Sequence, residues 1–237
     1  MEVKIYDTKE EVAKRFSAYF YEITKSGKQI NVALSGGSTP KIVFDYLAVE
    51  YADKIDWTKV FLYWGDERCV PPSDDESNYK MTVAHLLSKI KIPEANIFRV
   101  LGENDPEEEA IRYSKMISEN LPIENGIPQF DLVMLGMGDD GHTASVFPYN
   151  IELWDAAENC KVALHPDSGQ KRVTITGKII NNAKEVAFLV TGAGKTEKVT
   201  QIIKKSGNYA DYPANLVDPK SGNLVWFLDK AAAAEIE

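Results

Sequence analysis

Four short apolar segments of this chain each end in a loop that carries glycine or polar residues, and helical patterns separate most of them. The segments lie at residues 29–34, 60–64, 130–135 and 185–191. Strands that alternate with helices of about 10–15 residues form βαβ units, in which the strands run parallel. Parallel strands end at one edge of their sheet, so we expect the four loops to meet there. The pattern predicts an α/β fold, a Rossmann-like and mainly parallel sheet flanked by helices.

The length of the chain, 237 residues, allows one large domain with at most a small additional lobe. No internal repeat or low-complexity linker divides it, so we predict a single domain over residues 1–237. The irregular stretch at about 145–180 is the best candidate for a smaller αβ lobe. Further helices are predicted after Thr8 and at 40–50, 78–90, 107–120, 195–205 and 230–236, and further strands at 3–6, 97–100, 161–164, 172–176 and 224–228.

Charge and composition restrict the partners of the chain. The formal net charge of −9 argues against nucleic acid or an anionic membrane as a bulk partner. No apolar run reaches the roughly 18 residues of a membrane span, and the first residues lack the layout of a signal peptide. The two cysteines, Cys69 and Cys160, fit a reduced protein better than a disulfide framework. These features predict a cytoplasmic protein.

The most informative loop follows the segment at 130–135 and contains a histidine, His142, next to two acids and at the position where we expect a helix to begin. An imidazole titrates near neutral pH and can therefore act as a general base. The residues alone leave open whether Asp139 or Asp140 orients it, and a structural histidine is the alternative. The other histidines, His85 and His165, have no ligand-type spacing to it, so no metal site is expected.

Two familiar motifs are present without the features that their usual functions require. Residues 136–141 fit G-x-G-x-x-G, but two aspartates in that loop would repel a pyrophosphate, so we do not expect a dinucleotide site. Residues 194–196, Gly-Lys-Thr, lack the first glycine of a Walker motif, because Leu189 occupies its position. No G-x-S-x-G elbow is present, which disfavours a serine nucleophile.

Several loops carry groups that suit an anion. Residues 35–40 read Ser-Gly-Gly-Ser-Thr-Pro, and Gly36 and Gly37 allow backbone N–H groups at a helix start to approach a phosphate. Lys195 and Arg172 would add positive charge. A simple capped turn is the alternative for the glycine loop, and solvated surface charge for the two cations.

Residues 64–68, Trp-Gly-Asp-Glu-Arg, place two carboxylates and an arginine at the end of another strand. Asp66 and Arg68 suit hydroxyl recognition or acid–base chemistry, and an ion-pair cluster is the alternative. Together the loops offer anion donors, a base, carboxylates and cations. They predict a small, phosphorylated and hydroxyl-rich ligand.

These motifs resemble the 6-phosphogluconolactonase branch of the glucosamine-6-phosphate isomerase/6-phosphogluconolactonase family. The resemblance spans nearly the whole chain in the family's order. It is carried by residues 35–40, 64–68, 77–79, 136–148 (Gly-Met-Gly-Asp-Asp-Gly-His-Thr-Ala-Ser-Val-Phe-Pro), 172–176, 191–195, 213–215 and 226–229. It implies the fold shared by glucosamine-6-phosphate deaminase, ribose-5-phosphate isomerase and the CoA transferases. It also implies hydrolysis of 6-phospho-D-glucono-1,5-lactone in the oxidative pentose phosphate pathway, without cofactor or metal.

Carried over residue by residue, the resemblance makes His142 the general base and Asp140 the acid that helps to position it. The residues that would hold the substrate, largely its phosphate, are Ser38, Thr39, Arg172 and Lys195. Asp66 and Arg68 would line the site beside Gly36 and Gly37. The expected partner is a small sugar-phosphate lactone, and the expected assembly is a monomer or a weak homodimer.

Two other functions remain open. A glucosamine-6-phosphate deaminase would carry Asn-Glu-Pro shortly after the histidine, whereas residues 143–151 contain no carboxylate here. A non-catalytic sugar-phosphate sensor usually accompanies a DNA-binding segment, and none is recognisable in this acidic chain. Both features favour the lactonase.

Overall fold

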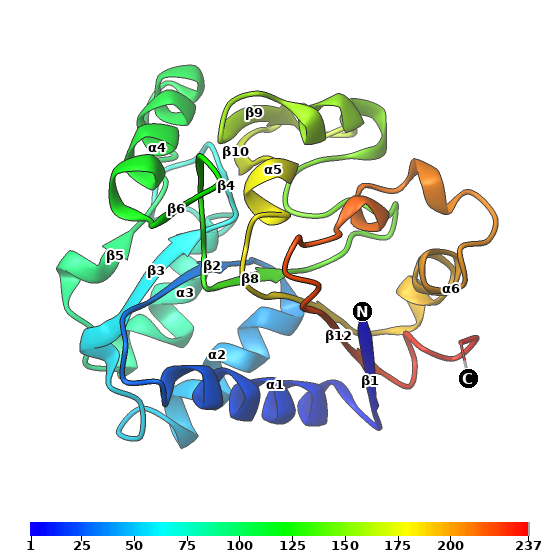
Figure 1. The fold of residues 1–237 in the computed structure, drawn as a ribbon, viewed down its shortest axis with the longest axis horizontal. Helices are drawn as coiled ribbons and strands as arrows, with labels where there is room; N and C mark the ends of the chain where they lie inside the picture. The colour runs from blue at the N-terminus through cyan, green and yellow to red at the C-terminus, as the bar shows by residue number, and fades with distance from the viewer. Residues whose placement is uncertain (237) are drawn as a thin grey trace.

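A computed structural model describes residues 1–236 and places a seven-stranded sheet at the centre of the molecule (Figure 1). In spatial order its strands are β1 (Glu2–Tyr6), β12 (Leu224–Asp229), β11 (Val186–Val190), β8 (Leu132–Leu135), β2 (Ile30–Leu34), β3 (Val60–Trp64) and β5 (Ile97–Phe98). Every neighbouring pair in this sheet is parallel. The predicted fold class, a mainly parallel sheet flanked by helices, is confirmed.

Helices cover the sheet because its central strands are apolar on both faces. All residues of β2, β8 and β11 are buried, as expected for strands that are covered on both sides. The helices are α1 (Lys9–Thr24), α2 (Ser38–Glu50), α3 (Asn78–His85), α4 (Pro106–Asn120), α5 (Gly177–Ile180) and α6 (Thr196–Lys204). Figure 1 shows α1 and α2 packed beside each other on one face. The cap predicted at Thr8 is present, since its hydroxyl accepts the backbone N–H of Glu11.

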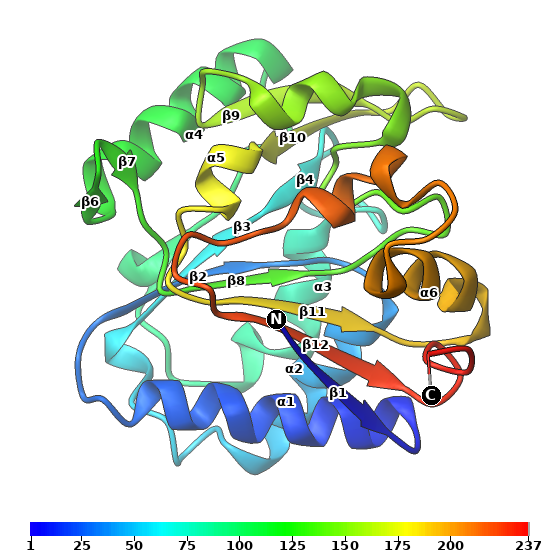
Figure 2. The ribbon, with the colours of Figure 1, turned by 45° about the vertical axis from the view of Figure 1, so that its right-hand side comes forward.

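A second, antiparallel sheet lies near α4 at the other side of the molecule (Figure 2). It consists of β4 (Asp66–Arg68), β10 (Lys171–Ile175) and β9 (Cys160–Leu164). The strand β4 was not predicted, because its three charged residues show no apolar alternation. The region 145–180 supplies β9 and β10, and its description as a separate lobe stays a prediction. A small hairpin, β6 (Ile123–Glu124) with β7 (Ile127–Pro128), precedes β8.

Three predicted elements were wrong. The helix predicted at 78–90 ends at His85, because Leu86 is buried with non-helical backbone angles, and a short 3-10 helix follows. Residues 230–236 form turns instead of a helix, since so short a segment does not sustain one by itself. No helix begins at His142, where a tight turn instead pairs Thr143 with Val146.

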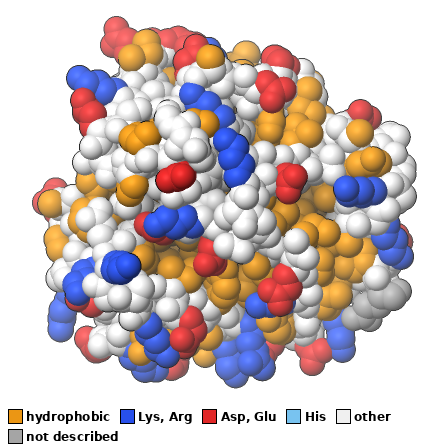
Figure 3. Space-filling model, viewed as in Figure 1, with side chains coloured by type: hydrophobic (Ala, Val, Ile, Leu, Met, Phe, Trp, Pro, Cys, Tyr) orange, Lys and Arg blue, Asp and Glu red, His pale blue; other side chains and the backbone are white. Residues whose placement is uncertain are grey.

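The remaining boundaries agree within a few residues, and 3-10 helices fill several connections. These lie at Trp57–Lys59, Leu87–Lys89, Glu94–Asn96, Pro148–Asp155, Ala193–Lys195, Tyr209–Asp211 and Pro213–Leu216. No helix within residues 1–236 is long and apolar enough to cross a membrane. On the face drawn in Figure 3, acidic and basic side chains are interspersed instead of forming one charged patch.

The strand order contains a topological switch between β2 and β8. From β2 the chain continues outward to β3 and β5, and it then returns to β8 on the other side of β2. In open parallel sheets the ligand crevice lies outside the carboxyl ends of the strands at such a switch. Figure 2 shows the arrowheads of β8, β11 and β12 directed to the same edge. The ligand site is therefore expected at the loops that follow β2 and β8.

Candidate active site

A cavity of about 170 Å³ lies at this switch point. Its wall combines the two glycine loops after β2 and β8 with residues of β4, the start of α3 and a residue from β10. The lining residues are Ser35, Gly36, Gly37, Asp66, Arg68, Asn78, Gly136, Met137, Gly138, His142, Ala144 and Arg172. Six residues singled out from the sequence thus share one cavity: Gly36, Gly37, Asp66, Arg68, His142 and Arg172.

The loop after β8 folds around His142. Nδ1 of His142 lies 2.7 Å from Oδ1 of Asp140, and the same oxygen accepts the backbone N–H of His142 at 3.0 Å. The imidazole packs so closely that a Cβ at Gly138 would lie 2.1 Å from Nδ1. Gly141 has a φ of 86°, which favours glycine. The glycines of this motif therefore serve the placement of the histidine.

Asp140 sets the tautomer of the histidine. Burial alone would raise the pKa of Asp140, but the hydrogen bond and charge of His142 outweigh it and lower the pKa below its usual value. An ionised carboxylate only accepts hydrogen bonds, so the neutral ring carries its proton on Nδ1 and has a free lone pair on Nε2. His142 lines the cavity, and a neutral Nε2 is the form that a general base requires.

The loop after β2 leads directly into α2. Gly37 precedes the helix with a φ of 107°, and the helix starts at Ser38, two residues before the predicted start. The first turn of a helix leaves N–H groups without intrahelical partners, which makes it a binding place for anions. Ser38 and Thr39 do not line the cavity. The hydroxyl of Thr39 lies 2.7 Å from that of Thr191 and so joins this loop to the one after β11.

Asp66 is held by buried polar residues that no sequence motif marks as part of a site. Oδ2 of Asp66 accepts the hydroxyl of Ser145 at 2.7 Å, and the backbone N–H of Ser145 donates to the hydroxyl of Thr174 at 3.1 Å. All three side chains are buried. The backbone carbonyl of Asp66 also accepts a hydrogen bond from Asn78. These contacts join segments far apart in the sequence, so no local signal marks them.

The guanidinium groups of Arg68 and Arg172 line the cavity and have N–H groups without hydrogen-bond partners. Arg172 is only 8% exposed, and among the described residues its side chain has no hydrogen-bond or ion-pair partner. It lies over the ring of Phe147, 5.6 Å from the centroid, and burial lowers its pKa while Asp66 partly offsets the effect. Nε of Arg68 is also buried without a partner. Buried guanidinium N–H groups without hydrogen-bond partners are costly, so these donors point to an anionic ligand.

Lys195 lies outside the cavity wall and contacts the neighbouring loop. Its Nζ is 2.5 Å from Oδ1 of Asp139, the acid that precedes Asp140. The two adjacent aspartates thus have separate partners, His142 for one and Lys195 for the other. Asp139 is largely exposed, and it is not the acid that orients the histidine. Among the predicted site residues, Ser38, Thr39, Asp140 and Lys195 flank the cavity without lining it.

The buried carboxylate of Glu67 holds the backbone beside Arg68, on the side of the cavity that carries the arginines. The side chain is 2% exposed and accepts the backbone N–H groups of Arg68, Asn78 and Tyr79 and the hydroxyl of Ser77. Burial raises the pKa of Glu67, and these hydrogen bonds partly offset the effect. The sequence shows Glu67 inside a motif, but its inward direction is evident only from the fold.

The site unites an oriented histidine, a buried carboxylate and two arginines. Within residues 1–236 no group of three or more His, Cys, Asp or Glu side chains is arranged to hold a metal ion. This arrangement can activate a water molecule beside a bound anion.

Known proteins are similar to this chain in sequence and in fold. The model of the family described as glucosamine-6-phosphate isomerases/6-phosphogluconolactonase matches residues 6–226. A 6-phosphogluconolactonase of Treponema pallidum is 44% identical over 202 residues, which covers 85% of this chain and 84% of the relative. One of Haemophilus influenzae is 41% identical over 229 residues and covers 96% of each chain.

Solved structures agree with the sequence relatives. A 6-phosphogluconolactonase from Trypanosoma brucei has a TM-score of 0.89 at 27% identity, over 100% of this chain and 98% of the other. A monomeric glucosamine-6-phosphate deaminase has a TM-score of 0.84 at 20% identity, over 99% of both chains, and shares the fold alone. Because the family model and both relatives extend over most of its length, the chain belongs to the glucosamine-6-phosphate isomerase/6-phosphogluconolactonase family.

Proposed function

We propose that this protein hydrolyses 6-phospho-D-glucono-1,5-lactone to 6-phosphogluconate, the second step of the oxidative pentose phosphate pathway. The observation that carries the proposal is the oriented histidine, His142, on the wall of a cavity that also contains the unpaired guanidinium of Arg172. A base and an anion-binding group in one cavity suit a phosphorylated ester. The sequence relatives are 6-phosphogluconolactonases, which favours this ester over others.

In the proposed reaction, Nε2 of His142 takes a proton from a water molecule that attacks C1 of the lactone. Backbone N–H groups of the glycine loops stabilise the negative oxygen that forms on C1. The C1–O bond to the ring oxygen then breaks, and His142 returns its proton to that oxygen. Asp140 keeps the proton on Nδ1 through the cycle and stabilises the imidazolium. The chemistry needs neither a cofactor nor a metal ion.

The phosphate is assigned to the positively charged groups around the cavity. Arg68 and Arg172 line it, whereas Lys195 and the start of α2 at Ser38 and Thr39 flank it. The proposal takes the protein to be cytoplasmic and a monomer or weak homodimer that binds a small sugar-phosphate lactone.

Glucosamine-6-phosphate deamination is the second candidate, because a deaminase shares the fold. Residues 143–151, which follow the histidine, contain no carboxylate to assist the ring-opening and proton-transfer steps of that reaction. The lactonase needs only one base, and the site supplies it.

A coupled assay tests the proposal. Glucose-6-phosphate dehydrogenase generates the lactone in place, and 6-phosphogluconate dehydrogenase reports its hydrolysis. We expect a rate well above the spontaneous one, and a kcat reduced by about 10²-fold or more in His142→Ala. The matched control is His85→Ala, since His85 contacts Asp45 and does not line the cavity. A folded protein without acceleration over the spontaneous rate would contradict the lactonase.

A further inference from the structure

The end of β3 lacks a strand neighbour on one side. In the parallel pair of β3 and β5, Tyr63 lies opposite Phe98, and β5 ends there. Trp64, the next residue, has no β5 residue beside it, although its backbone is buried. An unpaired buried N–H or C=O group is costly, so another group must complete the ladder. The position matters because Trp64 is two residues before Asp66.

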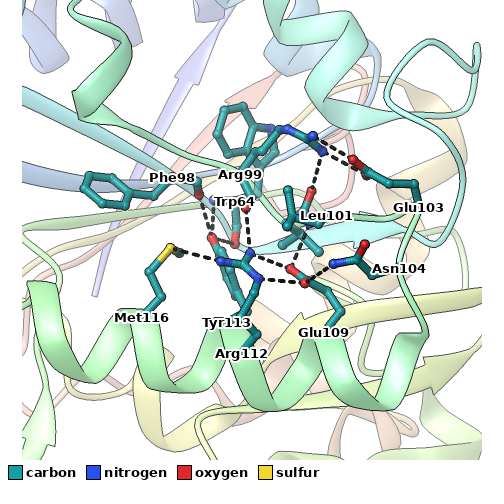
Figure 4. Close-up of polar contacts among 11 residues, drawn as sticks. Trp64, Phe98, Arg99, Leu101, Glu103, Asn104, Glu109, Arg112, Tyr113 and Met116 are labelled. Atoms are coloured by element: carbon teal, nitrogen blue, oxygen red, sulfur yellow. Dashed lines mark hydrogen bonds and ion pairs between the residues drawn. The ribbon is translucent and has the colours of Figure 1, made fainter.

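The hydroxyl of Tyr113, from α4, replaces the missing strand residue. It accepts the backbone N–H of Trp64 at 2.8 Å and lies 3.0 Å from the carbonyl oxygen of Trp64, to which it donates (Figure 4). The carbonyl oxygen of Phe98 lies 3.3 Å from the same hydroxyl. Tyr113 is 1% exposed, and burial raises its pKa well above the usual value, which keeps the hydroxyl protonated. One phenol thus supplies both a donor and an acceptor, as a strand residue would.

The same helix holds the segment that leaves β5. Figure 4 shows Glu109 and Arg112 in a paired arrangement beside Tyr113. The buried carboxylate of Glu109 accepts the backbone N–H of Leu101 at 2.8 Å, and Nη2 of Arg112 donates to the carbonyl of Arg99 at 3.2 Å. Three residues of one helix face therefore fix both the end of β3 and the chain after β5.

The segment after β5 packs closely against β4, the strand that carries Arg68. A Cβ at Gly102 would lie 2.4 Å from the carbonyl oxygen of Arg68 and 2.7 Å from that of Val70. Only glycine allows such a close approach of two backbones. Whatever holds Leu101 and Gly102 in place also holds the backbone of Arg68, which lines the cavity.

The backbone at Gly65, between Trp64 and Asp66, is held by hydrogen bonds to β2 and β10. The N–H of Gly65 donates to the carbonyl of Leu34, and the carbonyl of Gly65 accepts the N–H of Ile175, both at 2.8 Å. The α4 contacts complete this set at Trp64, on the side where β5 has ended.

We propose that Tyr113, supported by Glu109 and Arg112, is a positioning residue that sets the place of Asp66 and Arg68 in the active site by completing the edge of β3. Tyr113 does not line the cavity, so its hydroxyl acts on the site through the backbone of Trp64. The inference rests on the proposed lactonase activity, because Arg68 is assigned there to the phosphate of the substrate and Asp66 lines the same cavity. Loss of the hydroxyl should therefore weaken substrate binding more than it slows the chemical step.

The test compares two buried tyrosines. Tyr113→Phe removes the hydroxyl that bonds Trp64, whereas Tyr63→Phe removes a buried hydroxyl that has no partner among the described residues. We expect Tyr113→Phe to raise KM about five- to tenfold while kcat changes less than about threefold, since small displacements of binding groups have effects of this size or larger. Tyr63→Phe should leave both constants unchanged.

Urea unfolding of both variants separates positioning from stability, because the kinetics are measured where each variant is fully folded. If Tyr113→Phe has the wild-type KM under these conditions, the positioning role is refuted even if the variant is less stable. Wild-type protein without lactonase activity would instead refute the proposed function.

A second variant keeps the inference testable if Tyr113→Phe does not fold. Arg112→Met removes both the bond to Arg99 and the ion pair with Glu109, from a side chain that is 39% exposed. Lys115→Met on the same helix, where the side chain is 74% exposed, is the control for loss of a charge. We expect a rise in KM of about two- to fivefold for Arg112→Met and none for Lys115→Met. Equal KM values in the two variants would overturn the proposal.

Discussion

Oδ1 of Asp140 binds His142 twice, through Nδ1 of the ring at 2.7 Å and through the backbone N–H at 3.0 Å. The carboxylate thus fixes both the ring and the chain that carries it. A single oxygen with two donors leaves the imidazole little freedom to rotate, and it determines which ring nitrogen faces the cavity.

Asp140→Ala should therefore lower kcat about tenfold to a hundredfold with little change in KM, because the base loses its orientation and its tautomer but the substrate contacts remain. The neighbouring Asp139→Ala is the control, since Asp139 pairs with Lys195 and not with the histidine. Steady-state kinetics of the two variants decide the matter. Equal kcat values would remove Asp140 from the positioning of the base.

Arg172 should contribute to binding at the expense of stability. It is buried without a hydrogen-bond or ion-pair partner, and a charge buried in that way costs free energy that an apolar side chain does not. Arg172→Met is expected to raise KM tenfold or more while the free energy of unfolding stays equal or increases by about 1 kcal/mol. Urea unfolding and kinetics on the same preparation measure both. A variant that loses stability but keeps its KM would mark Arg172 as a structural cation.

The sequence predicted the sheet and the position of its loops because both depend on local patterns. Apolar runs of strand length and glycine-bearing loops gave β2, β3, β8 and β11 within two residues at either end. Parallel strands then bring the loops to one edge without further information. The order of the strands was not predictable, because it is set by packing between segments far apart in the chain.

The supporting contacts of the site were missed for the same reason. Ser145 reaches Asp66 across 79 positions of the sequence, and Tyr113 reaches Trp64 across 49. From the sequence, Glu67 is indistinguishable from an exposed surface charge, whereas in the fold its side chain is buried. The residues alone likewise left open whether Asp139 or Asp140 orients the histidine, since adjacent residues of one type differ only in the direction of their side chains. Only the family resemblance singled out Asp140.

Lys195 is expected to serve the phosphate from outside the cavity wall. Its ammonium group is paired with Asp139, so a phosphate would have to displace that carboxylate. Asp139 is largely exposed and can therefore move away into solvent. Lys195→Ala should raise KM about tenfold with kcat retained, because a contact remote from C1 binds substrate and transition state alike. Asp139→Ala frees the ammonium group, so its KM should be equal to or lower than that of the wild type. A normal KM in folded Lys195→Ala would refute the contact.

The lowered pKa of Asp140 predicts how its contribution to stability depends on pH. A carboxyl whose pKa is lower in the folded state stabilises the fold above its unfolded pKa of about 3.9, and the contribution is lost as pH falls through the folded value. The wild type should therefore exceed Asp140→Asn in free energy of unfolding near neutral pH. This difference should shrink below about pH 4. Urea unfolding at a series of pH values measures it, and a difference that stays constant between pH 7 and pH 2.5 would mean that the ionised form of Asp140 is not favoured by folding.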